Sequence, residues 1–404
     1  MISPALALLL PLLAALAGSD SDRRVVLEDL DGTTLERDLD TFAVEGPREL
    51  EAVLVRFEGP RGSGDAGTPG TGERPAGERA ELTLASGDRL VVGRLAGSGE
   101  ELRFELAGGV PLVLAIEELA SVVVPSRLPQ TPGAPLGPAP EGDRLYHRTG
   151  DVLDRIDGAV EGFTLEGVRF DSVVGTRLYD WDEVAALYIE HEPPAATAAS
   201  DDALPVVVDL LDGSRLRGSF RALDATGCTL DLGGGREVLI PARALAEIAV
   251  DDGRLAFLSD LAPAAVDEGS PFDDELGLVW RHRVDRAVDG SPLRAGGRAF
   301  TRGIGVHAPS RLTWELAGAW KELRGLVAID DQVARLTARG SVVFRVLVDG
   351  EPRWESAVLR GGDAPQTIPP IDLTDALTLD LEVDMATEFH MGDRADWLRV
   401  ILVR

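Results

Sequence analysis

The sequence predicts an all-β protein in which several small β-barrel or β-sandwich repeats precede a larger C-terminal β-sandwich. Two observations predict this class: short segments alternate apolar and polar residues, and turn glycines recur at a nearly constant interval. No stretch has the pattern of a long amphipathic helix. Of the 404 residues, 44% are hydrophobic and 27% charged, a composition that supplies a buried core and excludes disorder of the whole chain.

The repeats are visible in the spacing of their first turns. These turns fall at Gly32, Gly87, Gly150 and Gly213, which are 55, 63 and 63 residues apart. Apolar closing runs follow the last three glycines after 32, 34 and 32 residues, around Leu119, Val184 and Leu245. The first repeat is shorter, because its closing run already begins near Leu50. Asp-Gly pairs at two of the turns favour tight hairpins, so each unit is expected to be a twisted antiparallel barrel or sandwich of about five strands.

Composition divides these repeats from one another. Residues 59–79 and 125–142 are rich in glycine and proline and are predicted to be linkers, as is the shorter stretch Glu192–Asp202. The predicted β repeats are 18–58, 80–124, 143–191 and 204–252.

Residues 1–17 form an apolar segment that ends in small residues, Ala15-Leu16-Ala17. Its apolar run is too short to span a bilayer and fits a secretory signal with an A-x-A-like cleavage site. No Lys or Arg precedes the run, and the alternative is an uncleaved anchor or a buried helix. We expect an exported protein, periplasmic, in the cell envelope or extracellular, whose mature chain starts near Gly18 and has no membrane span.

The charge balance bears on the partners. Acidic residues outnumber basic ones 69 to 40, which gives a formal net charge of -29. Such a surface repels phosphate, so no nucleic-acid partner is expected. The pattern L-x-D-G-x-x-L-x-G from Leu210 to Gly218 faintly resembles Sm-like small barrels, but the repeats lack their basic, aromatic face for RNA.

The C-terminal stretch has its own strand pattern. Leu377, Leu379, Leu381 and Val383 alternate with polar residues, as in an antiparallel strand with one wet face. Phe344, Val346 and Val348 alternate with Val343, Arg345 and Leu347, so this strand is expected to be covered on both faces, and an Asp-Gly turn follows it. Five of the six tryptophans lie after residue 275. Pattern alone therefore predicts a β-sandwich in residues 255–404.

Five segments of this stretch carry a family resemblance, in the order Pro292–Leu316, Val327–Asp331, Gly340–Gly350, Trp354–Gly362 and Asp393–Trp397. They resemble the NPCBM family, also catalogued as family 51 of carbohydrate-binding modules. The resemblance implies a galactose-binding-like jelly-roll sandwich whose end loops bind a glycan or polysaccharide, sometimes with a structural calcium ion. It implies no catalysis.

The candidate carbohydrate-binding residues lie in the expected end loops of this sandwich: His307, Asp330, Asp331, Asp393, Asp396 and Trp397. A histidine or carboxylate there hydrogen-bonds sugar hydroxyls, and an indole stacks on the apolar face of a sugar ring. Oxygen ligands also suit a hard cation such as calcium, but no metal ligands are assigned.

Each candidate also has a structural alternative. His307 satisfies buried backbone carbonyls in that interpretation, and Asp330 and Asp331 cap a turn. Trp397 is then a buried core residue, with Asp396 paired to an arginine.

No catalytic constellation was found in the sequence. It holds five histidines but no H-E-x-x-H, G-x-S-x-G or phosphate-loop motif. Cys228, the one cysteine, lies in an apparent strand and is expected to be a small buried hydrophobe. The favoured hypothesis is an exported, non-enzymatic carbohydrate-binding protein. The first alternative is a structural or assembly protein of the cell envelope that uses the sandwich and repeats for contacts with envelope proteins. A less favoured one is an accessory subunit of an enzyme.

Overall fold

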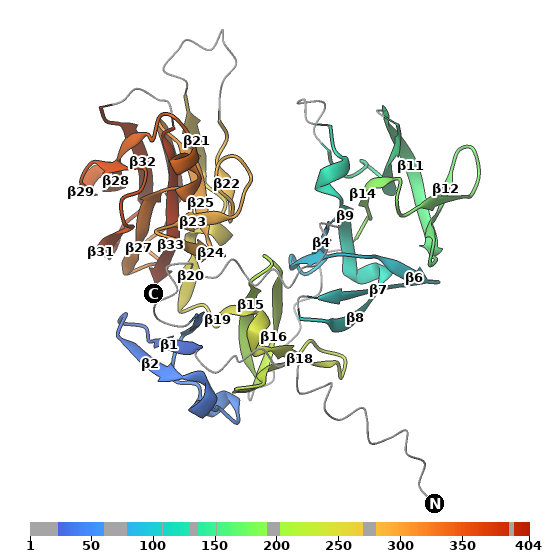
Figure 1. Cartoon of the computed structure of the whole chain (residues 1–404), viewed down its shortest axis with the longest axis horizontal. Helices are drawn as coiled ribbons and strands as arrows, with labels where there is room; N and C mark the ends of the chain where they lie inside the picture. Colours follow the sequence, from blue (N-terminus) through green and yellow to red (C-terminus); the bar gives the residue numbers. More distant parts are fainter. Residues whose placement is uncertain are drawn as a thin grey trace, which may run out of the picture. The chain divides into compact units, whose positions relative to one another are not determined.

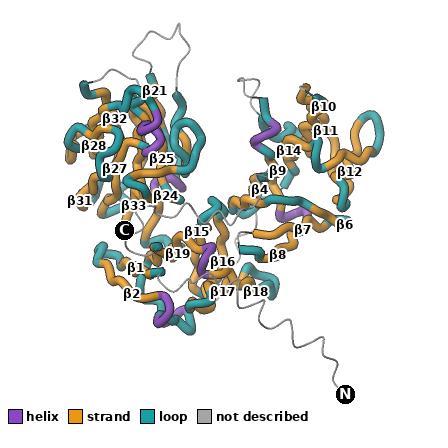
Figure 2. The backbone as a smooth tube through the Cα atoms, in the orientation of Figure 1, coloured by secondary structure: helices purple, strands orange, loops and turns teal. Residues whose placement is uncertain are grey.

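The computed structural model describes residues 23–59, 79–106, 108–129, 136–150, 152–191, 203–269, 280–387 and 392–404. The expected signal segment 1–17, most of the linker 59–79 and the stretch 192–202 lie outside these ranges. Within them, regular structure is almost entirely β-strand, with short 3-10 helices (Figure 1, Figure 2). The predicted all-β class is therefore confirmed. The chain divides into two compact units, one made mainly of residues up to Ala249 and the other mainly of Val250–Arg404.

The first unit contains the four repeats. The first repeat consists of β1 (Arg24–Glu28), β2 (Thr34–Asp38), η1 (Leu39–Thr41), η2 (Pro47–Glu49) and β3 (Leu54–Glu58). The second consists of β4 (Ala80–Leu84), β5 (Arg89–Val92), β6 (Ala96–Ser98), β7 (Glu101–Leu106), β8 (Val110–Ala115), η3 (Ile116–Glu118) and β9 (Leu119–Val123), followed by η4 (Pro125–Arg127). The third consists of β10 (Asp143–Thr149), β11 (Val152–Phe163), β12 (Gly167–Ser172), β13 (Arg177–Asp180) and β14 (Val184–Tyr188). The fourth consists of β15 (Leu204–Leu210), β16 (Arg215–Asp224), β17 (Gly227–Asp231), β18 (Glu237–Pro241), η5 (Ala242–Ala244) and β19 (Leu245–Val250).

The four glycines that revealed the repeats occupy equivalent turns. Each lies between the first two strands of its repeat and has a positive φ, 84°, 84°, 61° and 93° for Gly32, Gly87, Gly150 and Gly213. A side chain is strained in that backbone conformation, which explains the glycine. Each closing strand pairs with the first strand of its own repeat: β3 with β1, β9 with β4, β14 with β10 and β19 with β15. The sequence period is therefore a structural period.

The repeats join in pairs through these closing strands. Strand β9 pairs with β14, and β3 pairs with β19, both antiparallel. Arg127 adds a side-chain link between the second and third repeats. Its buried guanidinium donates to the carbonyls of Trp181 and Val184, the latter at 2.7 Å. Arg127 belongs to the stretch 125–142 that composition assigned to a linker. The structure differs there, because these hydrogen bonds hold η4 against the third repeat.

The second unit contains a two-sheet sandwich. Its elements are β20 (Leu255–Phe257), η6 (Leu258–Asp260), β21 (Ala265–Glu268), β22 (Arg283–Val284), β23 (Leu293–Ala295), β24 (Arg298–Phe300), β25 (Gly303–His307), β26 (Ser310–Glu315), β27 (Glu322–Ile329), η8 (Asp331–Arg335), β28 (Ser341–Val348), β29 (Glu351–Glu355), β30 (Leu359–Arg360), β31 (Gln366–Asp372), β32 (Thr378–Met385) and β33 (Arg394–Val403). One sheet has the order β22-β25-β33-β27-β31, with β20 also paired to β33. The other has the order β21-β26-β32-β28-β29, with β30 also paired to β28.

The main core lies between these two sheets. Trp314, Phe344 and Trp397 are buried in it together with aliphatic residues from both sheets. A second, smaller cluster covers the outer face of the β25–β33 sheet, where Leu293 and Phe300 of the β23–β24 hairpin pack with Leu398 of β33. The middle of this sheet is therefore buried on both sides, and side chains of β33 alternate between two apolar layers.

We predict that residues 255–404 fold by themselves, because they contain both sheets and both of these apolar clusters. Five of the six tryptophans lie in this fragment, so Trp fluorescence during thermal unfolding reports on it. One cooperative transition is expected. A broad, non-cooperative transition would show that the fragment depends on the repeats.

Candidate functional site

Glycines on β25 let a loop approach the outer face of its sheet. Gly303, Gly305 and His307 project to this face, while the alternate residues of the strand point into the core. A Cβ atom at Gly305 would lie 2.4 Å from the carbonyl oxygen of Arg286, closer than atoms approach. The loop 285–292 thus runs directly over Gly305, whereas a Cβ atom at Gly303 would meet Trp397 and Leu293. His307 follows at the end of the strand.

Trp280 stacks on His307. The ring centroids are 5.7 Å apart and the planes differ by 11°. Arg394 is the strand partner of His307 in β33, and its guanidinium carbon lies 5.5 Å from the centre of the Trp280 ring. Cross-strand partners project from the same face of a sheet, so His307 and Arg394 together support the indole. Trp280 nevertheless remains 39% exposed, which leaves aromatic surface open to solvent.

Polar side chains extend from this aromatic surface. Arg394 donates through Nη1 to Oδ2 of Asp289 at 2.5 Å. The other oxygen of Asp289 accepts from the backbone N–H and the hydroxyl of Ser291, at 3.0 and 2.5 Å. Gln332 of η8 donates to that hydroxyl. Burial alone raises the pKa of Asp289, but the hydrogen bonds from Ser291 and the charge of Arg394 outweigh it and lower the pKa below its usual value.

Asp330 and Asp331 organise the neighbouring turns. Oδ1 of Asp330 accepts from the N–H of Gln332 at 2.9 Å, and Oδ2 accepts from the N–H of Arg294 at 3.1 Å. The two oxygens of Asp331 accept from the two N–H groups of the turn Gly296–Gly297, at 2.9 and 2.8 Å. In the structure, both carboxylates therefore make the turn-capping contacts that formed their structural alternative.

Asp393 and Trp397 are completely buried. Oδ1 of Asp393 accepts from the backbone N–H of Ser341 at 2.7 Å, which ties the start of β28 to the start of β33. Trp397 meets Phe344 edge to face in the main core, with centroids 5.0 Å apart. No face of Trp397 is open to a sugar ring in the structure.

Asp396 is buried beside Asp330 on the outer side of β33. Burial, followed by the negative charge of Asp330, raises the pKa of Asp396 well above its ordinary value. Neither carboxylate oxygen of Asp396 has a hydrogen-bond partner in the structure, so the neutral acid, which removes one negative charge from this buried pair, is favoured there. The arginine expected to pair with Asp396 is absent from this contact, since Arg394 pairs with Asp289 instead.

The loops singled out from the sequence do meet. His307 lies opposite Arg394, and Ile329, one residue before Asp330, lies opposite Ala395. His307 is the member of the set that borders the exposed indole, while the five others are engaged in the fold. Trp280 was missed, because it precedes its strand without an alternating pattern around it. Its position beside two basic residues, Arg281 and His282, was the one available signal.

A calcium ion is a poor fit to the named carboxylates. Both oxygens of Asp330 and of Asp331 already accept backbone hydrogen bonds. Across the part of the chain that the structure describes, no group of three or more His, Cys, Asp or Glu side chains is placed to hold a metal ion. Calcium requires six to eight oxygen ligands. The structural calcium that the resemblance implies therefore stays a prediction without assigned ligands.

Two further expectations concern Cys228 and a membrane-spanning segment. Cys228 is buried, as expected, and burial raises the pKa of its thiol to about 12, which disfavours a nucleophilic thiolate. Among the described residues, no helix has the length and apolar character needed to cross a bilayer.

Comparison with known proteins shows which domain family this sandwich matches. Residues 254–403 match the sequence profile of the NPCBM/NEW2 domain. The resemblance read from the five sequence segments is thus confirmed. This NPCBM domain carries the exposed Trp280 and its polar neighbours.

Two curated relatives each match less than a third of the chain. A Renibacterium salmoninarum protein named as an endo-alpha-N-acetylgalactosaminidase is 34% identical over 109 residues, which are 27% of this chain and 7% of that protein. Alpha-1,3-galactosidase B of Akkermansia muciniphila is 34% identical over 119 residues, 29% of this chain and 14% of that protein. The chain therefore spans a small fraction of the length of either relative. A solved structure of a family 51 carbohydrate-binding module from Clostridium perfringens GH95, in complex with methyl-galactose, is 19% identical. That likeness covers 37% of this chain and 99% of that one, with a TM-score of 0.32.

We predict that Asp396→Asn stabilises the NPCBM domain once the pH exceeds the raised pKa of Asp396. A raised pKa means that the folded state holds the proton more tightly than the unfolded state. The stabilisation is complete below the ordinary Asp pKa and is lost as pH rises through the raised pKa. Asn mimics the neutral acid at every pH, so the variant should lose this pH dependence. Each tenfold difference in proton affinity corresponds to ~1.4 kcal/mol.

The measurement is urea unfolding of the full chain between pH 4 and 9, followed by Trp fluorescence. The matched control is Asp267→Asn, an exposed carboxylate of the same domain, which should leave the pH profile unchanged. An Asp396→Asn profile with the wild-type slope would show that Asp396 is ionised in the folded protein.

Proposed function

We propose that this chain is a carbohydrate-binding protein whose NPCBM domain recognises glycans at the exposed face of Trp280. The observation that carries the proposal is the 39% exposed indole, supported from beneath by His307 and Arg394. Sugars present an apolar C–H face that packs on such a ring. Asp289, Ser291 and Gln332 form a connected set of donors and acceptors in the adjoining loops, which suits sugar hydroxyls.

Terminal galactose or N-acetylgalactosamine is the ligand class that we propose for this site. The names of the two curated relatives, which refer to an N-acetylgalactosaminidase and an alpha-1,3-galactosidase, support this choice. One stacking contact and a few hydrogen bonds are each worth ~1 kcal/mol. The expected dissociation constants therefore lie in the micromolar to millimolar range, about 4–8 kcal/mol.

The proposal includes export and the lack of a hydrolytic activity of the chain itself. The sequence segment 1–17 supports export. The two regions that the structure describes, small β repeats and a sandwich domain, support a binding role. On this view the repeats space or assemble the binding domain.

We predict that Trp280→Ala weakens glycan binding about tenfold or more, because it removes the stacking surface, and tenfold corresponds to ~1.4 kcal/mol. The full chain is first screened on a glycan array, and the best galactoside is then titrated calorimetrically. Trp354→Ala is the control, since Trp354 lies on β29 of the other sheet. Each variant must first melt like the wild type. Unchanged affinity in a folded Trp280→Ala variant would place the sugar elsewhere.

A second candidate function, a protein-contact role for the repeats, rests on the turn between β12 and β13. Val173 and Val174 lie there and are 102% and 64% exposed, so this hairpin tip offers an apolar pair for a protein contact. We predict that Val173→Ser with Val174→Ser reduces co-purification of envelope proteins with the chain but leaves galactoside affinity unchanged. Retention of the same protein partners by the double variant would contradict this role.

A further inference from the structure

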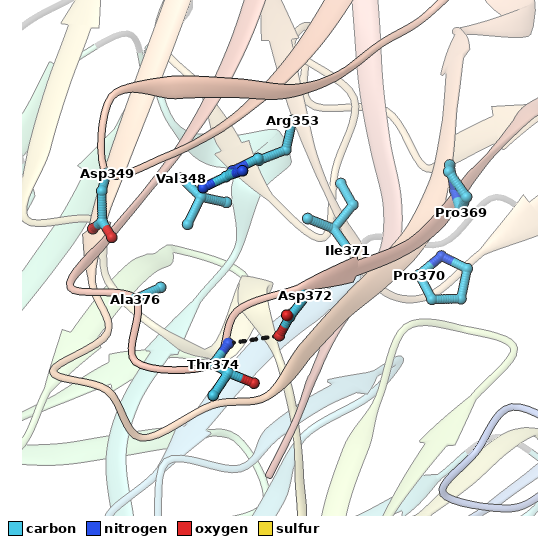
Figure 3. A pocket seen from close by; sticks show the side chains of 9 residues that line it. All are labelled: Val348, Asp349, Arg353, Pro369, Pro370, Ile371, Asp372, Thr374 and Ala376. Atoms are coloured by element: carbon cyan, nitrogen blue, oxygen red, sulfur yellow. Dashed lines mark hydrogen bonds between the residues drawn. The ribbon is translucent and has the colours of Figure 1, made fainter.

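The NPCBM domain also has a hollow with a volume of about 330 Å³. Strand β28 ends at it, the β28–β29 turn borders it, and the end of β31 supplies an apolar strip of Pro369, Pro370 and Ile371 (Figure 3). Arg353 of β29 enters the lining together with Asp349 and Asp372. The hollow therefore combines an apolar surface with both signs of charge.

The hollow and the Trp280 surface are at opposite ends of the sandwich. Strand β28 starts at Ser341, which is bonded to Asp393 beside Arg394, and ends at Val348 in the hollow. Its 8 residues span ~26 Å at ~3.3 Å per residue. A single monosaccharide therefore cannot occupy both places.

The carboxylates of the hollow are held in place and ionised. Oδ1 of Asp349 accepts from the N–H groups of Leu377 and Thr378, at 2.9 and 2.8 Å, and Oδ1 of Asp372 accepts from Thr374 at 2.9 Å. Backbone hydrogen bonds from Thr378 and Leu377 lower the pKa of Asp349, and hydrogen bonds from the side chain and then the backbone of Thr374 lower the pKa of Asp372. The charge of Arg353 lowers both to a lesser extent. The bonds from backbone N–H groups hold the carboxylates in preorganised positions.

The charged side chains of the hollow disfavour a simple anion and a simple cation as its ligand. An anion faces two carboxylates and one guanidinium within a chain of net charge -29. A cation faces the guanidinium of Arg353 in the same small space. A neutral ring with several hydroxyls satisfies both kinds of group, because it donates to carboxylates and accepts from arginine. Its C–H face fits the Pro369, Pro370 and Ile371 strip, and a volume of about 330 Å³ accommodates one hexose.

We propose that this hollow is a second saccharide site, in which Arg353, Asp349 and Asp372 bind the hydroxyls of a neutral hexose unit. The NPCBM domain is then bivalent along its length. It binds two positions of one extended glycan or bridges two chains, and simultaneous engagement raises the apparent affinity for a polymer. The site does not depend on Trp280.

The test uses the full chain and saturation-transfer difference NMR with methyl β-galactoside, N-acetylglucosamine and methyl α-mannoside as probes. In the Trp280→Ala background, at least one probe should still bind. Adding Arg353→Ala should weaken that binding about tenfold or more. The matched control is Arg360→Ala, an exposed arginine on β30 outside the hollow, which should leave the binding unchanged. Arg353 is itself exposed, so its variant is expected to melt like the wild type.

The outcomes separate the two sites. Loss of all probe signals in Trp280→Ala alone overturns the second site and leaves the Trp280 site standing. Equal signals in the Arg353→Ala and Arg360→Ala double variants also overturn the second site. A single Arg353→Ala that abolishes binding, with Trp280→Ala unchanged, supports the hollow and contradicts the Trp280 site. No signal for any probe with the wild type contradicts both.

Discussion

The close approach of the loop 285–292 to β25 determines most of what surrounds the Trp280 surface. Gly305 has no side chain to hold this loop away. The loop brings Asp289 to Arg394 and fixes the guanidinium beside the indole. It also lies over Gly305, whose strand partner is Asp396, and so contributes to the burial of that carboxyl. One steric requirement thus accounts for the covered outer face, the buried acid and the open ring of Trp280.

Burying acids in a chain of net charge -29 requires that each negative charge be compensated or removed. The domain uses three different means at this end of the sandwich. Backbone N–H groups hydrogen-bond Asp330 and Asp331, Arg394 pairs with Asp289, and burial raises the pKa of Asp396, which favours its neutral form. The carboxylates therefore stabilise the loops without placing an unpaired charge behind the indole.

The sequence predicted the repeats correctly because their signal is local. A glycine at a positive φ is required at the first hairpin turn of each repeat. The turn glycines therefore recur along the sequence at the interval of the repeats. The pairing of β9 with β14 and of β3 with β19 was not predictable in this way. Such pairing uses backbone groups that every residue has, and the strands are distant in sequence. Arg127 was misassigned to a linker because its role depends on two carbonyls more than fifty residues away.

The candidate site shows the same division between location and role. The family resemblance predicted that the loops of His307, Asp330 and Asp393 come together at one end of the sandwich, and the register places His307 opposite Arg394 and Ile329 opposite Ala395. The roles of single residues depend on which face of β33 they occupy, and β33 is covered on both faces. Alternation then places Trp397 in the main core and Asp396 under the outer layer. Because both faces of β33 are covered by apolar layers, the sequence pattern does not show whether Trp397 points into the main core or toward the outer layer. Trp280, outside any strand, is free of this constraint and is left at the surface.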